Sequence, residues 1–215
     1  MTSVDSLLLQ TRRMPLVAIL RGLDPAQATA IGEVLLECGF RTLEVPLNRP
    51  GALESIARLV HAMPEHVLVG GGTVLTVADV DAVHGAGGRL IVSPNCDPRV
   101  IAHAVARGMV CAPGVATPSE AFTALHAGAH ALKIFPAEMV GHAGLKVFKS
   151  VLPATTDLWP VGGITPQGMA GWCAAGATGF GIGSQLYAPG ATASEVRARG
   201  HLFVQAWRDL QGTQD

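Results

Sequence analysis

A lysine lies inside an apolar run, Ala131-Leu132-Lys133-Ile134-Phe135-Pro136, that predicts a short buried strand ending at a proline. An ammonium group is costly to bury without a partner. An apolar environment lowers the pKa of the amine and favours its neutral form, which can attack a carbonyl carbon. Lys133 is therefore a candidate nucleophile. The alternative is a lysine at the end of a strand whose ammonium group reaches solvent.

A carboxylate occupies a similar position in another apolar run, where Glu44 lies between Leu43 and Val45. An unpaired carboxylate in a short buried strand would be costly, so Glu44 either has a raised pKa or has a partner. The first case predicts a general acid and base that shares a cavity with Lys133. The second predicts a structural salt bridge to Lys133 or to an arginine.

Arg21 and Thr73 each follow an apolar run directly. An arginine in this position suits bidentate binding of a carboxylate, and the alternative is an ordinary loop arginine. The Thr73 hydroxyl could hydrogen-bond the same carboxylate, or it could cap the helix that follows.

Two glycine-rich corners follow the last two apolar runs, at Gly162-Gly163-Ile164-Thr165 and Gly181-Ile182-Gly183-Ser184. Glycine has no Cβ, so the backbone N–H groups of such a corner can approach an anion closely. In barrels built from eight strand–helix units, the corners after the last two strands frequently bind phosphate. The pair of corners therefore predicts a phosphate site.

Eight apolar runs recur along the chain, each followed by a corner and a helical stretch. They predict strands at Leu16–Leu20, Thr42–Val45, Val67–Gly70, Leu90–Val92, Val110–Ala112, Ala131–Phe135, Leu158–Val161 and Gly179–Ile182. The stretches between them predict helices at Pro25–Cys38, Pro50–Met63, Val77–Gly85, Pro98–Arg107, Pro118–Ala127, Leu145–Leu152, Pro166–Ala175 and Ser194–Leu210. This alternation predicts an α/β protein, a (β/α)8 TIM barrel, with the candidate side chains together at the carboxyl ends of the strands.

The composition suits one domain over residues 1–215, with a short amphipathic helix over residues 3–12 before the barrel. Only 14% of residues are charged and 49% are hydrophobic, so we expect contacts between subunits. The net charge of -1, with no basic run, argues against nucleic acid, and no apolar stretch is long enough for a membrane span. Four scattered cysteines and a start without signal-peptide character predict a cytoplasmic protein.

The chain resembles the class I aldolases that act on 2-keto-3-deoxy-6-phospho sugar acids, and the matching stretches run through nearly the whole sequence in family order. They are Ile19-Leu20-Arg21-Gly22, Leu43-Glu44-Val45-Pro46-Leu47-Asn48, Gly72-Thr73-Val74-Leu75, Ser93-Pro94-Asn95, Ala131-Leu132-Lys133-Ile134-Phe135-Pro136, Val161-Gly162-Gly163 and Gly181-Ile182-Gly183-Ser184.

This resemblance implies Lys133 as the Schiff-base lysine and Glu44 as the proton-transfer residue. It also implies that Arg21 and Thr73 contact the pyruvyl carboxylate and that the glycine corners contact the phosphate. The substrate-binding residues that it implies besides Arg21 and Thr73 are Asn48, Pro94, Val161, Gly162, Gly163, Gly183 and Ser184. Further implications are a homotrimer, no metal and no other cofactor. The small-molecule partners would be a phosphorylated sugar acid, pyruvate and glyceraldehyde 3-phosphate.

The galactonate-derived and gluconate-derived substrates differ only at C4. Val161 stands where relatives of the gluconate type tend to carry a hydroxyl residue, so we expect a bias toward the galactonate-derived substrate, with the gluconate-derived one as the alternative. Three other classes stay open. They are a metal-dependent pyruvate aldolase, a phosphate-binding isomerase or synthase with the same barrel, and a phosphosugar-binding protein without catalysis.

Overall fold

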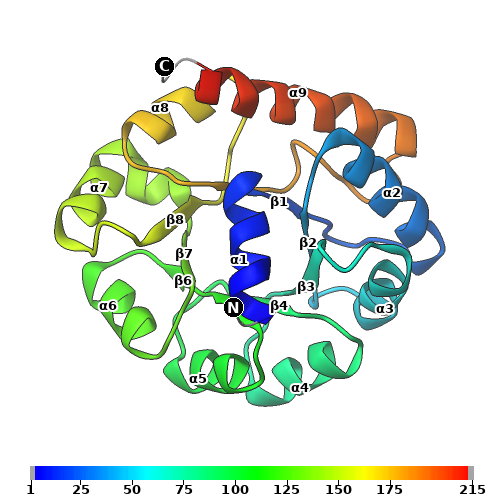
Figure 1. Cartoon of the computed structure of the whole chain (residues 1–215), viewed down its shortest axis with the longest axis horizontal. Helices are drawn as coiled ribbons and strands as arrows, with labels where there is room; N and C mark the ends of the chain where they lie inside the picture. The colour runs from blue at the N-terminus through cyan, green and yellow to red at the C-terminus, as the bar shows by residue number, and fades with distance from the viewer. Residues whose placement is uncertain (1–2, 213–215) are drawn as a thin grey trace.

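The computed structural model describes residues 3–212, in which strands and helices alternate and most of the helices form a ring around the strands (Figure 1). The strands are β1 (Leu16–Ile19), β2 (Thr42–Pro46), β3 (Leu68–Gly72), β4 (Leu90–Val92), β5 (Val110–Ala112), β6 (Gly114–Val115), β7 (Ala131–Ile134), β8 (Asp157–Pro160) and β9 (Phe180–Ile182). The helices are α1 (Ser3–Arg13), η1 (Pro25–Gln27), α2 (Ala28–Cys38), α3 (Ala52–Ala62), α4 (Val77–Gly85), α5 (Pro98–Ala106), α6 (Pro118–His126), α7 (Ala137–Val151), α8 (Met169–Ala174) and α9 (Ala193–Gly212).

Every strand pair is parallel, in a six-stranded sheet of order β5-β4-β3-β2-β1-β9 and a three-stranded sheet of order β6-β7-β8. Val161, directly after β8, forms an isolated parallel bridge with Gly181 in β9. The run at Val110 continues as β6 after Pro113, which has no N–H to donate to a ladder. All eight predicted runs are strands, and the parallel α/β class is confirmed.

Local sequence explains where several helices begin. Thr76 and Asp79 form a capping box at the start of α4, and Thr117 and Glu120 form another at the start of α6. In each box the hydroxyl accepts the N–H of the acidic residue, and the carboxylate accepts the N–H of the threonine. Each cap follows the carboxyl end of a strand, β3 before α4 and β6 before α6.

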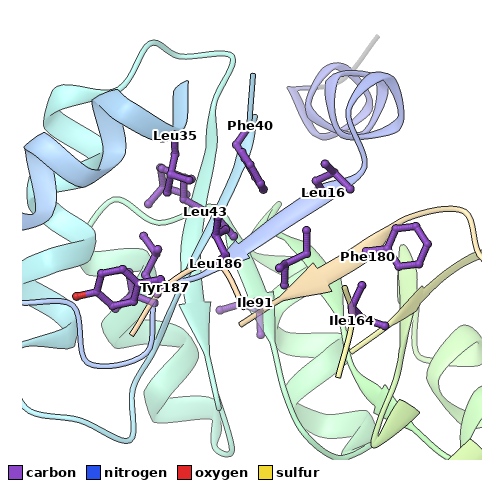
Figure 2. Close-up of a cluster of buried hydrophobic side chains, with 14 of the residues drawn as sticks. Leu16, Leu35, Phe40, Leu43, Ile91, Ile164, Phe180, Leu186 and Tyr187 are labelled. Atoms are coloured by element: carbon purple, nitrogen blue, oxygen red, sulfur yellow. The ribbon is translucent and has the colours of Figure 1, made fainter. Parts of the chain in front are cut away.

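The core has two parts. Side chains between the strands and the outer helices form the larger one, and Figure 2 shows some of them, including Leu35, Phe40, Leu43 and Phe180. The smaller one, the inner part, lies on the other side of the strands and comprises Leu7, Val17, Leu68, Leu90, Val92, Val110, Ala112, Ala131 and Trp159. Because strand residues are buried on both faces, the strands are apolar without alternation.

Helix α1 lies across the centre of the ring (Figure 1), at the end where β1 begins. Leu7 is only 4% exposed and belongs to the inner part of the core. Arg12 Nε donates to Asp157 Oδ2 at 2.9 Å and ties α1 to β8. The helix predicted over residues 3–12 is thus confirmed, and it closes the end of the strands opposite the candidate site.

Helices α7 and α8 do not begin where they were predicted to begin. Helix α7 begins at Ala137, eight residues before the predicted start at Leu145, and its Gly141 is non-helical with φ 65° and ψ 174°. Helix α8 begins at Met169 rather than Pro166. All four cysteines are free thiols. In residues 3–212, no helix combines the length and apolar character needed to cross a membrane.

Candidate active site

Lys133 lies in β7 and is 7% exposed. Its register partners are Gly114 in β6 and Trp159 in β8, and its Nζ lies 4.7 Å from the centroid of the Phe135 ring. Burial lowers the pKa of the Lys133 amine, the nearby Glu44 carboxylate opposes this shift, and the Arg21 guanidinium adds to it. The amine therefore releases its proton more readily than an exposed lysine does.

Glu44 lies in β2 and is 2% exposed. Burial raises the pKa of its carboxyl group, while the positive charges of Lys133 and Arg21 oppose the increase. The two buried groups are near enough to influence each other, and burial drives both toward their neutral forms. A carboxyl group with a raised pKa beside an amine with a lowered pKa can take up and return a proton during a reaction.

A glycine in β3 makes room for the Glu44 side chain. Pro46 of β2 pairs with Gly72, and a Cβ placed on Gly72 would overlap Glu44 Oε1. Gly72 is not among the residues with positive φ, so its backbone conformation does not require glycine. The space that Glu44 occupies is therefore the reason for a glycine there. This role follows from the register between two strands, and the sequence alone did not indicate it.

A cavity of about 290 Å³ opens at the carboxyl ends of β1, β8 and β9. Its lining includes six residues predicted from the sequence: Arg21, Val161, Gly162, Gly163, Gly183 and Ser184. Ile164 and Gly181, which belong to the two predicted corners, also line it, and the lining residues outside the predicted site are Ile19, Phe135, Gln185, Tyr187, Ala188 and Pro189.

Two of the additional lining residues connect this cavity with the buried pair. Ile19 is the register partner of Glu44, and the Phe135 ring faces Lys133 Nζ. Lys133 and Glu44 are not among the residues that line the cavity, and these two neighbours place the buried pair next to its wall. The arrangement suits a ligand whose reacting carbon approaches the amine while the rest of it fills the cavity.

The two glycine corners have different backbone geometry. Gly162 has φ 120° and Gly163 has φ 61°, which other residues rarely adopt. A Cβ on Gly162 would also collide with the carboxylate of Glu138 in the first turn of α7.

At the other corner, the Leu186 and Tyr187 N–H groups both donate to the Gly183 carbonyl, at 2.8 Å and 3.0 Å. The Ser184 and Gln185 N–H groups precede them, as at the start of a helix, where such groups are available to an anion. Tyr187 is 2% exposed beside Leu186 (Figure 2), and within residues 3–212 its buried hydroxyl has no hydrogen-bond partner.

The other predicted residues surround the site. Arg21 Nη1 donates to Asn48 Oδ1 at 2.9 Å, and Asn48 does not line the cavity. Thr73 is half-buried with φ 55°, and Thr76, not Thr73, caps α4. The Pro94 carbonyl lies where a Cβ on Gly114 would be. Within residues 3–212, no three His, Cys, Asp or Glu side chains are grouped so that they could hold a metal ion.

Comparison with known proteins relates this geometry to a family. The family model described as KDPG and KHG aldolase matches residues 7–198. The probable 2-dehydro-3-deoxy-6-phosphogalactonate aldolase of Rhizobium meliloti (strain 1021) is 43% identical over 211 residues, which cover 98% of this chain and 100% of that protein. The 2-dehydro-3-deoxy-6-phosphogalactonate aldolase of Escherichia coli (strain K12) is 44% identical over 197 residues, which cover 92% of this chain and 96% of that protein.

Solved structures that are similar to this chain point to the same family. A structure described as native KDPGal has a TM-score of 0.91 at 44% identity and covers 93% of this chain and 97% of its own. The 2-keto-3-deoxy-6-phosphogluconate aldolase of Zymomonas mobilis ZM4 with 3-phosphoglycerate has a TM-score of 0.82 at 31% identity, with 94% of each chain covered. The chain therefore belongs to the KDPG and KHG aldolase family, whose members are carbon–carbon lyases.

Proposed function

We propose that the protein is a class I aldolase that cleaves 2-dehydro-3-deoxy-6-phosphogalactonate into pyruvate and D-glyceraldehyde 3-phosphate. The observation that carries the proposal is the buried pair of Lys133 and Glu44 behind the cavity, with the pKa of the amine lowered and that of the carboxyl group raised. The activity of the relatives, as their names give it, supports the choice of substrate.

The reaction follows from the chemistry of these two groups. The Lys133 amine attacks the C2 ketone, and loss of water leaves a protonated imine that can accept an electron pair. Glu44, directly or through a water molecule, takes the proton of the C4 hydroxyl. The C3–C4 bond breaks, its electrons form an enamine, and glyceraldehyde 3-phosphate leaves. A proton then adds to C3, and water hydrolyses the imine to pyruvate and the free amine.

The remaining residues hold the substrate at both ends. Arg21, which lines the cavity, and Thr73 are proposed to bind the carboxylate. Gly162, Gly163, Gly183 and Ser184 are proposed to bind the phosphate, supported by the positive φ values and by the available N–H groups. Contacts remote from the breaking bond help to keep C2 aligned with the amine. Pro94 is proposed to form part of the wall near Lys133, supported by its contact with Gly114, the partner of Lys133.

Substrate choice is assigned to Val161. Its apolar side chain lines the cavity and offers no hydrogen bond to a C4 hydroxyl, so it does not favour the gluconate configuration as a threonine would. One hydrogen bond is worth about 0.5–1.5 kcal/mol, about a tenfold preference at most. We expect kcat/KM to be higher for the galactonate-derived epimer and the difference to narrow in Val161→Thr. A wild-type preference for the other epimer would leave the aldolase chemistry intact and reassign the substrate.

The proposal includes a closed (β/α)8 barrel, a C3 homotrimer and a cytoplasmic location. The bridge between Val161 and Gly181 supports closure, because it joins the two sheets on one side. Exposed apolar side chains on α6 and α7 support assembly; they are Phe122, Met139, Val147 and Val151. Light scattering at micromolar concentration is expected to give three times the chain mass of 22.2 kDa, and a monomer would contradict the trimer.

Borohydride reduction in the presence of pyruvate tests the chemistry. The expected product is a pyruvyl secondary amine on the peptide that contains Lys133, identified by mass spectrometry. Lys133→Ala and Lys133→Arg are expected to abolish trapping and cleavage, because neither alanine nor a guanidinium forms this imine. Lys146→Arg, at an exposed position of α7, serves as the matched control. Trapping at another lysine, or cleavage by Lys133→Ala, would refute the proposal.

A further inference from the structure

Arg21 and Asn48 extend from neighbouring strands of the six-stranded sheet. Ile19 in β1 pairs with Glu44 in β2, and the two side chains follow these residues beyond the strand ends. Arg21 Nη1 donates to Asn48 Oδ1 at 2.9 Å. Arg21 lines the cavity whereas Asn48 does not. Because the Asn48 oxygen accepts from the guanidinium, Asn48 is placed to act on a ligand through Arg21.

The neutral amide suits this role. An asparagine oxygen accepts one of the five N–H donors of the guanidinium and leaves its positive charge intact. The other donors remain free to bind a carboxylate in the bidentate way that arginine favours. An aspartate would fit the same space, but its charge would neutralise the guanidinium and compete with an acidic ligand.

The opposite side of the Arg21 backbone is also constrained. Gly22 has φ 74°, and a Cβ there would lie 3.1 Å from the Pro189 side chain, so the chain directly after Arg21 is packed against the loop that follows β9. With the backbone fixed, the freedom left to Arg21 is that of its long side chain, which is exposed to solvent. A hydrogen bond at its end selects one orientation among many rotamers.

We propose that Asn48 is a positioning residue, which holds the Arg21 guanidinium in the orientation that binds the substrate carboxylate and contributes to binding only through Arg21. This inference rests on the proposed function, in which Arg21 binds that carboxylate. Arg21 also acts electrostatically on both Lys133 and Glu44, so its placement influences the reacting groups as well.

The test measures the pyruvate concentration that gives half-maximal borohydride trapping, since this readout needs no cleavage activity. Asn48→Ala is expected to raise it about five- to tenfold, the value of one lost hydrogen bond. Asn48→Asp, of nearly the same shape, is expected to raise it further, because its carboxylate occupies the guanidinium. The maximal extent of trapping is expected to stay at the wild-type level in both variants. Asn95→Ala, at an exposed asparagine after β4, is the control.

A double-mutant cycle separates positioning from direct contact. In an Arg21→Ala background, Asn48→Ala and Asn48→Asp are expected to cause no further change, because the group that they act on is absent. An equal fold-change in that background would overturn the inference, as would wild-type pyruvate dependence in both single variants. Absence of trapping in the wild-type enzyme would instead refute the proposed function. If Asn48→Ala unfolds, as judged by circular dichroism, the test relies on Asn48→Asp in the wild-type background and in the Arg21→Ala background.

Discussion

At the scale of single residues, the site is defined by what burial does to two side chains of opposite charge. Lys133 would normally be an ammonium and Glu44 a carboxylate, and burial shifts the pKa of each toward the neutral form. Their mutual attraction opposes both shifts. The balance leaves an amine that can attack a ketone and an acid that can move protons, at the cost of stability.

The loss of stability caused by burying Lys133 is expected to depend on pH. The pKa of Lys133 is lowered from its usual 10.5 in the folded state, so between the two pKa values the unfolded chain binds more protons. The stability of the wild-type protein relative to Lys133→Met should therefore rise as the pH increases toward 10.5, the usual pKa of lysine. Urea unfolding of both proteins across this range measures the difference. Lys146→Met controls for the change in net charge, and a constant difference would contradict the shift.

A second prediction concerns the space beside Glu44. Gly72→Ala places a methyl group on the position of Glu44 Oε1, so the carboxyl group must move. We expect kcat to fall by about 10²-fold, the usual size of general acid–base catalysis, while trapping of pyruvate at Lys133 persists. Gly85→Ala is the control, because a Cβ there meets nothing within 4 Å. Normal turnover by Gly72→Ala would show that Glu44 tolerates displacement.

Residue types and their apolar neighbours were enough to predict that Lys133 and Glu44 are buried, and the structure confirms this. The roles of Gly72 and Phe135 could not be predicted in the same way. Each depends on a contact whose geometry, the register of two strands or the turn of a ring toward an amine, is set by tertiary packing. The same limit applies to Tyr187, whose apolar neighbours indicate burial but not that it lines the cavity.

At the scale of elements, the corner after β8 depends on two glycines and on the start of α7. Gly162 has φ 120°, and the Glu138 carboxylate fills the place of its missing Cβ. Gly162→Ala is expected to destabilise the protein by about 1–3 kcal/mol and to raise KM for the phosphorylated substrate more than the pyruvate concentration for half-maximal trapping. Adding Glu138→Ala should recover only the part of the lost stability that comes from the clash with the Glu138 carboxylate. Equal effects on both ligands would contradict a local role at the phosphate.

Strand positions were predictable because buried parallel strands are continuous apolar runs, and β4 and β5 begin and end where they were expected. Helix α4 also has its predicted bounds, which its capping box explains. The first part of α7 was missed because Gly141 and Gly144 suggest a loop. The chain does break at Gly141, yet helical turns form on both sides of it.

At the scale of the whole molecule, one end of the strands carries the cavity and the other end contributes to stability. The cavity opens at one end, and α1 covers the other (Figure 1). Leu7→Ala is expected to lower the free energy of unfolding by about 2–4 kcal/mol, because Leu7 is 4% exposed in the inner core. Leu9→Ala, in the same helix at 44% exposed, should change it little. KM should be unaltered in both variants, and a raised KM would show that the two ends are coupled.

The bridge between Val161 and Gly181 has a consequence for how substrate preference can evolve. The backbone of Val161 fastens the edge of one sheet to the other, while its side chain covers Gly181 and lines the cavity. Val161, the residue proposed to discriminate the epimers, thus also joins the two sheets. A substitution that changes selectivity will weaken or strengthen the contact between the two sheets. A ligand bound across this contact will stabilise it. Changes of specificity at this position should therefore be selected together with compensating changes in β9.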